Sequence, residues 1–268
     1  MMNWICREKK IEYGCHTLIM GIVNVTPDSF SDGGEHFSKE NAVNYALELI
    51  SDGADIIDLG AQSTRPGYTE ITPEEEWSRL EGVIKAIREK TDVPISVDTY
   101  FPYVAERALA EGADIINDVS GVFNPDMAEL IKRSGAGWVI THAQSGGVKE
   151  VGNFFDEFIT KCITFGIKRE QLCVDCGTGF GKSYEQNLEL IANQKALKID
   201  GVPLLIGVSR KRVIGTASGE GEPSKRIFGN IAADTAAIFG GVDIIRLHDV
   251  KDEIKGIKTA EEIKKWIR

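Results

Sequence analysis

The sequence predicts an α/β fold of the (β/α)8 barrel, or TIM barrel, class on three observations. Eight short apolar runs rich in Ile and Val recur about every 20 to 40 residues, which is the length of one strand followed by one helix. The runs do not alternate strictly between apolar and polar residues, which is typical of parallel strands that helices cover on both faces. Each run also ends at a polar or charged residue, and the strand ends of a parallel barrel meet at one face.

The strands are expected wherever these apolar runs occur. In chain order the predicted strands are residues 18–25, 54–59, 94–97, 114–117, 138–141, 172–175, 203–207 and 243–247. The polar residues at or near their ends, in the same order, are Asn24, Asp58, Asp98, Asn117, His142, Asp175, Ser209 with Lys211, and Arg246 with His248. Because barrels carry their reactive groups at the carboxyl ends of the strands, these residues are the candidate site.

Start signals for helices stand between several of the strands. Residues 72–75 (TPEE) offer an N-cap hydroxyl, a proline at the first helical position and a glutamate placed for a capping box. Residues 124–125 (NP) repeat the cap and the proline, and residues 259–262 (TAEE) repeat the cap and the acidic residues. We therefore expect helices to begin at these three points.

No change in composition and no linker rich in Pro, Gly or Ser divides the chain, so we predict one domain over residues 1–268. A doubly wound open sheet is the alternative architecture. Eight strand and helix units in about 250 residues fit closure into a barrel better. Residues 4–13 (WICREKKIEY) precede the first barrel strand, and we expect them to form a short hairpin at the barrel bottom.

Composition argues against several classes of function. The net charge of −10 argues against nucleic acid or an anionic membrane surface as a partner. No apolar stretch approaches the roughly 20 residues of a spanning helix, and the first residues lack a secretory signal, so we expect a cytoplasmic protein. Five cysteines, an odd number, indicate reduced thiols. Cys173 and Cys176 form a C-x-x-C pair, but no second pair or nearby His completes a metal site.

The loops after the first two predicted strands are rich in functional groups. Residues 20–34 (MGIVNVTPDSFSDGG) combine turn-forming residues with Phe30 and with a carboxamide at the strand exit. Residues 60–68 (GAQSTRPGY) carry hydroxyls, the guanidinium of Arg65 and the rigid Pro66, a combination suited to an anion. Because loops at this face of a barrel carry function, we expect both to contribute to the site.

The motifs along the chain resemble those of the dihydropteroate synthases, the sulfonamide-target enzymes of folate synthesis. In order they are NVTPDSFSDGG from residue 24, STRPG from 63, SVDT from 96, IIND from 115, GFGK from 179, SRK from 209 and RLHD from 246. Each motif is weak by itself. Seven of them in the order and at the spacing of the family make the resemblance specific.

The resemblance implies that a pterin methyl diphosphate is joined to 4-aminobenzoate with release of pyrophosphate. It assigns the pterin to Asp98, Asn117, Asp175 and Lys211, the last of which reaches the pterin carbonyl. A pterin edge presents an amidine-like pair of donors and a lactam, so carboxylates that accept and an amide that does both suit it. Arg210 is expected to point outward, because neighbouring strand residues face opposite ways.

The resemblance also implies a diphosphate site with a Mg²⁺ cofactor. Arg246 and His248 are two residues apart and therefore share a face, and the family uses both around the diphosphate. The other implied members of this site are Asn24, Thr64 and Arg65. Asn24 is the implied metal contact, since Mg²⁺ commonly keeps several waters and takes phosphate oxygens as further ligands.

We expect a dissociative reaction. The diphosphate leaves with its charge neutralised by Mg²⁺ and basic side chains, the pterin ring spreads the resulting methylene cation, and the amine attacks. The residues expected to act in the reaction are Asp32, Arg65 and Lys211. Those expected to hold the aminobenzoate are Phe30, Thr64, Pro66 and Ser209.

Several positions depart from the family pattern. Gln62 stands in place of a glutamate, residues 141–144 (THAQ) replace a methionine-bearing segment, and Cys176 replaces a proline. None of these changes removes a group that the mechanism requires. Two alternatives stay open, a pterin-dependent methyltransferase and a pterin-binding paralogue with weak catalysis or none. Asp58 and His142 have no assigned role.

The resemblance further implies a homodimer formed through helices late in the barrel. The Ala- and Ile-rich residues 227–241 are compatible with such an interface and equally with burial against the barrel. The expected partners are therefore the small-molecule substrates and a second copy of the chain.

Overall fold

Every predicted apolar run forms a strand of one closed barrel. The computed structural model describes residues 2–25, 34–62 and 70–267, and within those ranges eight parallel strands pair in the closed order β10-β3-β4-β5-β6-β7-β8-β9. In chain order they are β3 (Leu18–Asn24), β4 (Ile56–Gly60), β5 (Ile95–Asp98), β6 (Ile115–Asp118), β7 (Gly137–Thr141), β8 (Leu172–Asp175), β9 (Leu204–Ile206) and β10 (Ile244–Leu247). Their bounds lie within two residues of the predictions, and the (β/α)8 barrel is confirmed.

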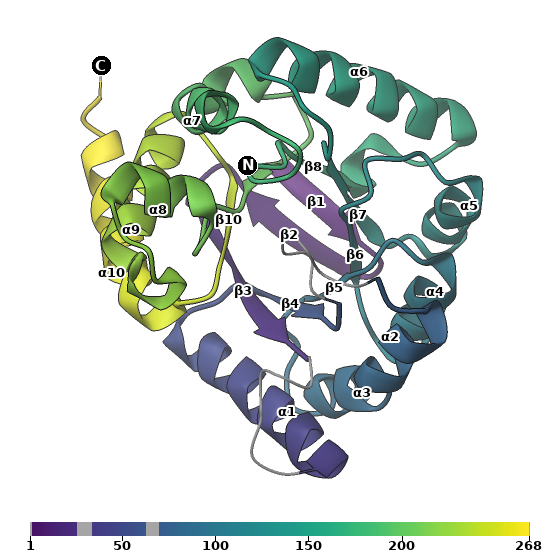
Figure 1. Ribbon diagram of the computed structural model, residues 1–268. Helices are drawn as coiled ribbons and strands as arrows, with labels where there is room; N and C mark the ends of the chain where they lie inside the picture. The colour runs from purple at the N-terminus through teal and green to yellow at the C-terminus, as the bar shows by residue number, and fades with distance from the viewer. Residues whose placement is uncertain (1, 26–33, 63–69, 268) are drawn as a thin grey trace.

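Helices surround the barrel on its outside (Figure 1). The α-helices are α1 (Gly34–Asp52), α2 (Pro73–Leu80), α3 (Val83–Arg88), α4 (Pro102–Ala110), α5 (Pro125–Ser134), α6 (Val148–Phe165), α7 (Tyr184–Ala192), α8 (Arg212–Ser218), α9 (Ile227–Phe239) and α10 (Val250–Lys264). Short 3-10 helices are η2 (Arg169–Gln171), η3 (Gln194–Leu197) and η4 (Pro223–Lys225). In the described part of the chain, none of these helices combines the length and the apolar character needed to cross a membrane.

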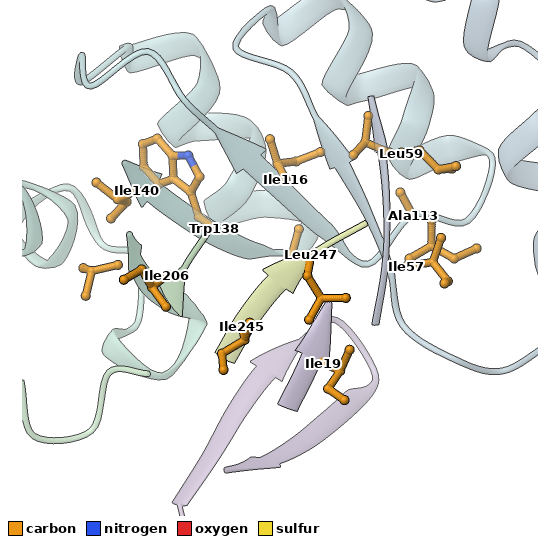
Figure 2. Close-up of a cluster of buried hydrophobic side chains, with 14 of the residues drawn as sticks. Ile19, Ile57, Leu59, Ala113, Ile116, Trp138, Ile140, Ile206, Ile245 and Leu247 are labelled. Atoms are coloured by element: carbon orange, nitrogen blue, oxygen red, sulfur yellow. The ribbon is translucent and has the colours of Figure 1, made fainter. Parts of the chain in front are cut away.

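Because side chains alternate along the strands, they belong to two separate hydrophobic cores. One set points outward, lies under the helices and is almost entirely apolar (Figure 2). Its members on the strands include Ile19, Ile57, Leu59, Ile116, Trp138, Ile140, Ile206, Ile245 and Leu247. Each fully buried side chain of this kind stabilises the fold by about 1.5–3 kcal/mol. Because successive strand residues face opposite ways, the residues between them line the barrel interior.

The interior of the barrel is apolar at the amino ends of the strands. The inward side chains there form a second cluster, which contains Met20, Ile56, Ile115, Val139, Cys173, Leu205 and Ile244. An antiparallel hairpin of β1 (Met2–Cys6) and β2 (Lys9–Tyr13) contributes Trp4, Cys6, Ile11 and Tyr13 to the same cluster. Figure 1 shows this hairpin crossing the centre of the ring. The expected hairpin at the barrel bottom is therefore confirmed.

Polar contacts fix the hairpin in place. Trp4 Nε1 donates to the backbone oxygen of Gln171 at 2.9 Å. The Arg7 guanidinium donates to the backbone oxygens of Leu109 and Ala113, also at 2.9 Å. These bonds satisfy carbonyl groups at the barrel rim that would otherwise be costly to bury. The hairpin closes the bottom, which leaves the opposite face for a ligand.

Two of the three expected helix starts are confirmed. Thr72 caps α2 by accepting from the backbone N–H of Glu75 at 3.2 Å, and Asn124 caps α5 through its side-chain oxygen. The expected capping box at Glu75 is wrong, because the Glu75 carboxylate accepts instead from Arg79 at 2.6 Å. An i, i+4 ion pair of this kind competes with the capping box for the glutamate side chain.

The third expected helix start is wrong. Residues 259–262 lie inside α10, which already begins at Val250. Thr259 Oγ1 donates to the backbone oxygen of Lys255, one turn earlier, at 2.8 Å. Once a helix has formed, adding a residue is favourable, so a residue with capping potential does not interrupt it.

The C-x-x-C pair is part of the packed interior. Cys173 and Cys176 are both fully buried, and both carry free thiols. Burial raises the pKa of each thiol, whereas reactive and metal-binding cysteines need the thiolate. The pair therefore acts in packing.

Candidate functional site

The upper half of the barrel interior is polar and charged. Inward positions near the carboxyl ends of five strands hold Asp58, Asp98, Asn117, Asp175 and Arg246. Their neighbours along each strand belong to the outward core, so alternation turns these five side chains inward. Four of them are predicted site residues that the barrel does bring together.

The guanidinium of Arg246 connects these groups across the barrel. Its Nε donates to Asp58 Oδ2 at 2.6 Å, and its Nη2 donates to Asp98 Oδ2 at 2.8 Å. Asn117 Nδ2 donates to the same Asp58 oxygen at 3.1 Å. We call these four residues the Arg246 network; it cross-links β10, β4, β5 and β6. Asp58, which had no assigned role, is its centre.

The Arg246 network has one guanidinium for two carboxylates. Burial raises the pKa of Asp98 to about 7; Arg246 opposes this rise, and Asp58 adds to it. Among the described residues, Asp58 Oδ1 and Asn117 Oδ1 are buried and have no hydrogen-bond partner. Buried acceptors of this kind are costly unless a donor meets them. The network is therefore suited to a ligand edge that presents N–H groups.

Asp175 and Lys211 are both held by the turn that follows β8. Asp175 Oδ1 accepts from the backbone N–H of Gly177 at 2.8 Å. Lys211 Nζ donates to the backbone oxygen of Thr178 and lies 5.0 Å from the centre of the Phe180 ring. Burial raises the pKa of Asp175 and lowers that of Lys211. A carboxylate acceptor and an ammonium donor thus stand at one side of the site.

Ser209 and His248 form a second polar pair at the rim. Ser209 Oγ lies 3.0 Å from His248 Nδ1 and also accepts from the His248 backbone N–H at 3.2 Å. Between Ser209 and the lysine of the site, Arg210 turns away, as expected, although it lies in a turn after β9 and not in a strand; its Nε donates to Asp249 Oδ2 at 2.9 Å. Its backbone has a left-handed φ of 59°, and its N–H donates to Asn230 Oδ1. These contacts outside the barrel fix the loop that carries both site residues.

Asn24 lies at the end of β3 beside a glycine. Asn24 pairs in register with Gly60, and a Cβ added at Gly60 would lie 4.0 Å from Asn24 Oδ1 and 3.9 Å from Asp98 Oδ2. Both oxygens therefore lie beside this glycine, and the Asp98 oxygen already accepts from Arg246 Nη2. Among the described residues, no group of three or more His, Cys, Asp or Glu side chains surrounds a metal position.

Two of the departures from the family pattern have a local structural role. Gln62 Nε2 donates to the Tyr100 hydroxyl at 2.8 Å, and Gln62 Oε1 accepts from the Ile71 N–H at 3.2 Å. An amide makes both bonds, whereas a carboxylate cannot donate. The Cys176 thiol lies 3.4 Å from Thr178 Oγ1, within the turn after β8.

His142 acts as a buried aromatic residue. Its ring lies edge-on to Phe154, with centroids 5.0 Å apart, and only 4% of the residue is exposed. Burial lowers its pKa to about 4, so the imidazole is neutral at physiological pH. We assign it to packing at the end of β7.

Three residues of this region were not assigned from the sequence. Asp58 faces the barrel interior, as Asp98 does, and the alternation of side chains along its strand could have identified it. Phe180 and Lys182 lie in the recognised GFGK motif, but the contacts they make are with backbone and a distant lysine, which sequence patterns do not reveal. The predicted site residues outside the described ranges are Phe30, Asp32, Thr64, Arg65 and Pro66.

Comparison with known proteins gives one consistent result. Residues 20–248 match the family model described as pterin binding enzyme. The chain is 40% identical over 264 residues to a dihydropteroate synthase of Clostridium beijerinckii, covering 95% of this chain and 97% of that protein. Two solved structures are similar. A dihydropteroate synthase of Clostridium difficile in the presence of pteroic acid has 42% identity and a TM-score of 0.89, covering 94% of this chain and 98% of that chain. One of Xanthomonas albilineans with 4-aminobenzoic acid has 38% identity and a TM-score of 0.92, covering 98% of each.

Replacement of Asp98 by asparagine is expected to change how stability depends on pH. The folded state holds a proton on Asp98 up to about pH 7, whereas the unfolded chain loses it near pH 4. Wild-type stability therefore falls as pH rises through this window. Asp98→Asn lacks this loss, so its unfolding free energy relative to wild type should rise by about 2 kcal/mol between pH 5 and pH 8. Urea denaturation at both pH values measures this difference.

The matched control for this measurement is Glu157→Gln, which removes an exposed carboxylate on α6. The pH dependence of Asp98→Asn is compared with that of this variant. A constant difference for Asp98→Asn would contradict the assignment of a raised pKa to this group.

Proposed function

The chain belongs to the pterin-binding enzyme family, and we infer from this membership that it is a dihydropteroate synthase. It condenses (7,8-dihydropterin-6-yl)methyl diphosphate with 4-aminobenzoate to give 7,8-dihydropteroate and pyrophosphate, in folate synthesis. The observation that carries this function is the similarity over nearly the whole chain together with the convergence of its motifs on one barrel face. We further propose a single domain over residues 1–268 and a cytoplasmic location.

The pterin is proposed to lie in the upper barrel between the Arg246 network and Lys211. Asp98, Asn117 and Asp175 would accept from its N–H groups, and Lys211 would donate to its carbonyl oxygen. Two features support this arrangement. The network has an excess of carboxylate over cation, and its buried acceptor oxygens include atoms with no partner in the described chain. Charge-assisted bonds to such groups are stronger than neutral ones.

The diphosphate is proposed to lie above the pterin, near His248 and Asn24. Arg246 already donates through Nε and Nη2 to its two carboxylates, so its remaining nitrogen is the one proposed for a phosphate oxygen. Thr64 and Arg65 are proposed to complete this site. Asn24 is the residue proposed to contact Mg²⁺, which when bound would supply charge neutralisation for the diphosphate.

The proposed reaction breaks the C–O bond between the pterin methylene and the diphosphate. The departing diphosphate takes the electron pair, and the basic groups around it neutralise the charge that develops. The carboxylates that accept from the pterin stabilise the positive charge left on the ring. The amine of 4-aminobenzoate then forms the C–N bond and releases its proton to solvent. Asp32, Arg65 and Lys211 are the residues proposed to act in these steps.

The 4-aminobenzoate is proposed to bind at the rim beside the pterin. Ser209 lies there next to His248, and Phe30, Thr64 and Pro66 are proposed to cover the ring from the two loops. A methyltransferase of the same fold would need no diphosphate site. Arg246 and His248, both proposed to contact the diphosphate, therefore favour the synthase over that alternative.

Turnover tests this function directly. Wild-type protein with the pterin methyl diphosphate, 4-aminobenzoate and Mg²⁺ should release pyrophosphate and form dihydropteroate, measured by a coupled pyrophosphate assay and by chromatography. Lys211→Met should lower kcat/KM by about 100-fold, because it removes a charged donor from the substrate. Lys10→Met, at an exposed lysine on β2 of the hairpin that closes the opposite end of the barrel, is the control. Pterin binding without pyrophosphate release from wild type would refute the synthase function.

We also propose a homodimer formed through α9. The buried residues of this helix are Asn230, Asp234, Ala237 and Ile238. Its exposed residues include Phe228, Ala232, Ala236 and Phe239, which recur at helical spacing and form one apolar stripe. Phe228 is 86% exposed, and a large aromatic residue on an apolar helix face is typical of a protein interface.

Phe228→Asp is expected to convert the dimer to a monomer, because it places a charge in the apolar stripe at its most exposed large residue. Sedimentation velocity at micromolar concentration measures the change. Leu188→Asp, at another partly exposed apolar residue on α7, is the control for a general loss of stability. A monomeric wild type, or a Phe228→Asp protein that stays dimeric, would contradict the proposed interface.

A further inference from the structure

The side chain of Lys182 lies in a cage of backbone oxygens. Its Nζ donates to the backbone oxygens of His142 at 2.7 Å, Gly177 at 2.9 Å, and Gln144 and Phe180 at 3.2 Å. An ammonium group has three protons, and these four acceptors engage all of them. Lys182 therefore has no proton left for a substrate, and its contribution is to the position of the backbone around it.

The cage joins two loops that approach each other unusually closely. Gly177 has a φ of 66°, and a Cβ there would lie 2.0 Å from the backbone oxygen of His142. Gly181 has a φ of 59°, and a Cβ there would lie 2.9 Å from the backbone oxygen of Ala143. Carbonyl dipoles that converge in this way repel one another unless a cation lies between them. The ammonium of Lys182 supplies that cation.

The turn fixed by Lys182 carries contacts of two candidate pterin-binding residues. The N–H of Gly177 donates to Asp175, and the oxygen of Thr178 accepts from Lys211. A shift of this turn would therefore displace an acceptor and a donor together. Misplacement by about 1 Å is enough to weaken a site substantially.

We propose that Lys182 is a positioning residue whose ammonium, acting as a tethered cation, fixes residues 176–182 against residues 142–144 and thereby holds Asp175 and Lys211 in their pterin-binding positions. The proposal rests on the proposed function for the identity of the ligand. It adds a residue that touches no substrate and acts only through backbone oxygens.

Chemical rescue tests the proposal. In Lys182→Ala the dissociation constant for a bare pterin should rise about tenfold or more, because the loss of the cation releases the turn. Propylammonium, which replaces the missing carbons and the ammonium, should restore much of the affinity. Tetramethylammonium at the same ionic strength has no N–H donor and should restore none. Isothermal titration calorimetry measures all three constants, and Lys149→Ala, at an exposed lysine on α6, is the matched control.

Wild-type affinity in Lys182→Ala, or equal effects of propylammonium and tetramethylammonium, would overturn the proposal. If Lys182→Ala does not fold, Lys182→Arg takes its place. A planar guanidinium spreads its donors and cannot direct them to four converging oxygens, so weaker pterin binding supports the proposal and unchanged binding overturns it. Binding of bare pterin needs no turnover, so a wild type that fails to release pyrophosphate would refute the synthase function and leave this test valid.

Discussion

The ion pairs of Arg246 determine what the upper half of the barrel is able to bind. One guanidinium from β10 reaches carboxylates on β4 and β5, and Asn117 on β6 joins the same Asp58 oxygen. Removing the cation would leave Asp58 as a fully buried, unpaired charge, which costs about 3–5 kcal/mol. Retaining it still leaves acceptor oxygens in excess. The network is thus paired internally, yet among the described residues Asp58 Oδ1 and Asn117 Oδ1 still have no donor.

The alternation of strand side chains is what places this network inside the barrel. Along each strand, every second residue faces the helices and is almost always apolar, and the residues between them face inward. At the bottom these inward residues are apolar and pack against the hairpin. At the top they include the polar and charged residues of the site. A shift of one residue in any strand would exchange the two sets, so the hydrophobic layer that stabilises the barrel also fixes the orientation of the site.

Strand positions and the polar residues at their ends were predictable because apolar runs and their spacing are local properties of the sequence. The ion pairs were not, because Arg246 and Asp58 are 188 residues apart and nothing local records which acid meets which base. The cap signal at residues 259–262 failed because a helix begun at Val250 simply continues through it. Lys182 was recognisable only as part of a motif. Its partners are backbone oxygens, which carry no signature in the sequence.

A double-mutant cycle between Arg246 and Asp58 tests the central role of this network most directly. The unfolding free energies of wild type, Arg246→Gln, Asp58→Asn and the double variant are measured by urea denaturation at pH 7. Each single change should destabilise the fold strongly, and the double variant should recover about 2 kcal/mol or more of the summed loss, because it removes both charges together. Losses that add within about 0.5 kcal/mol would contradict the account, since independent residues behave in that way.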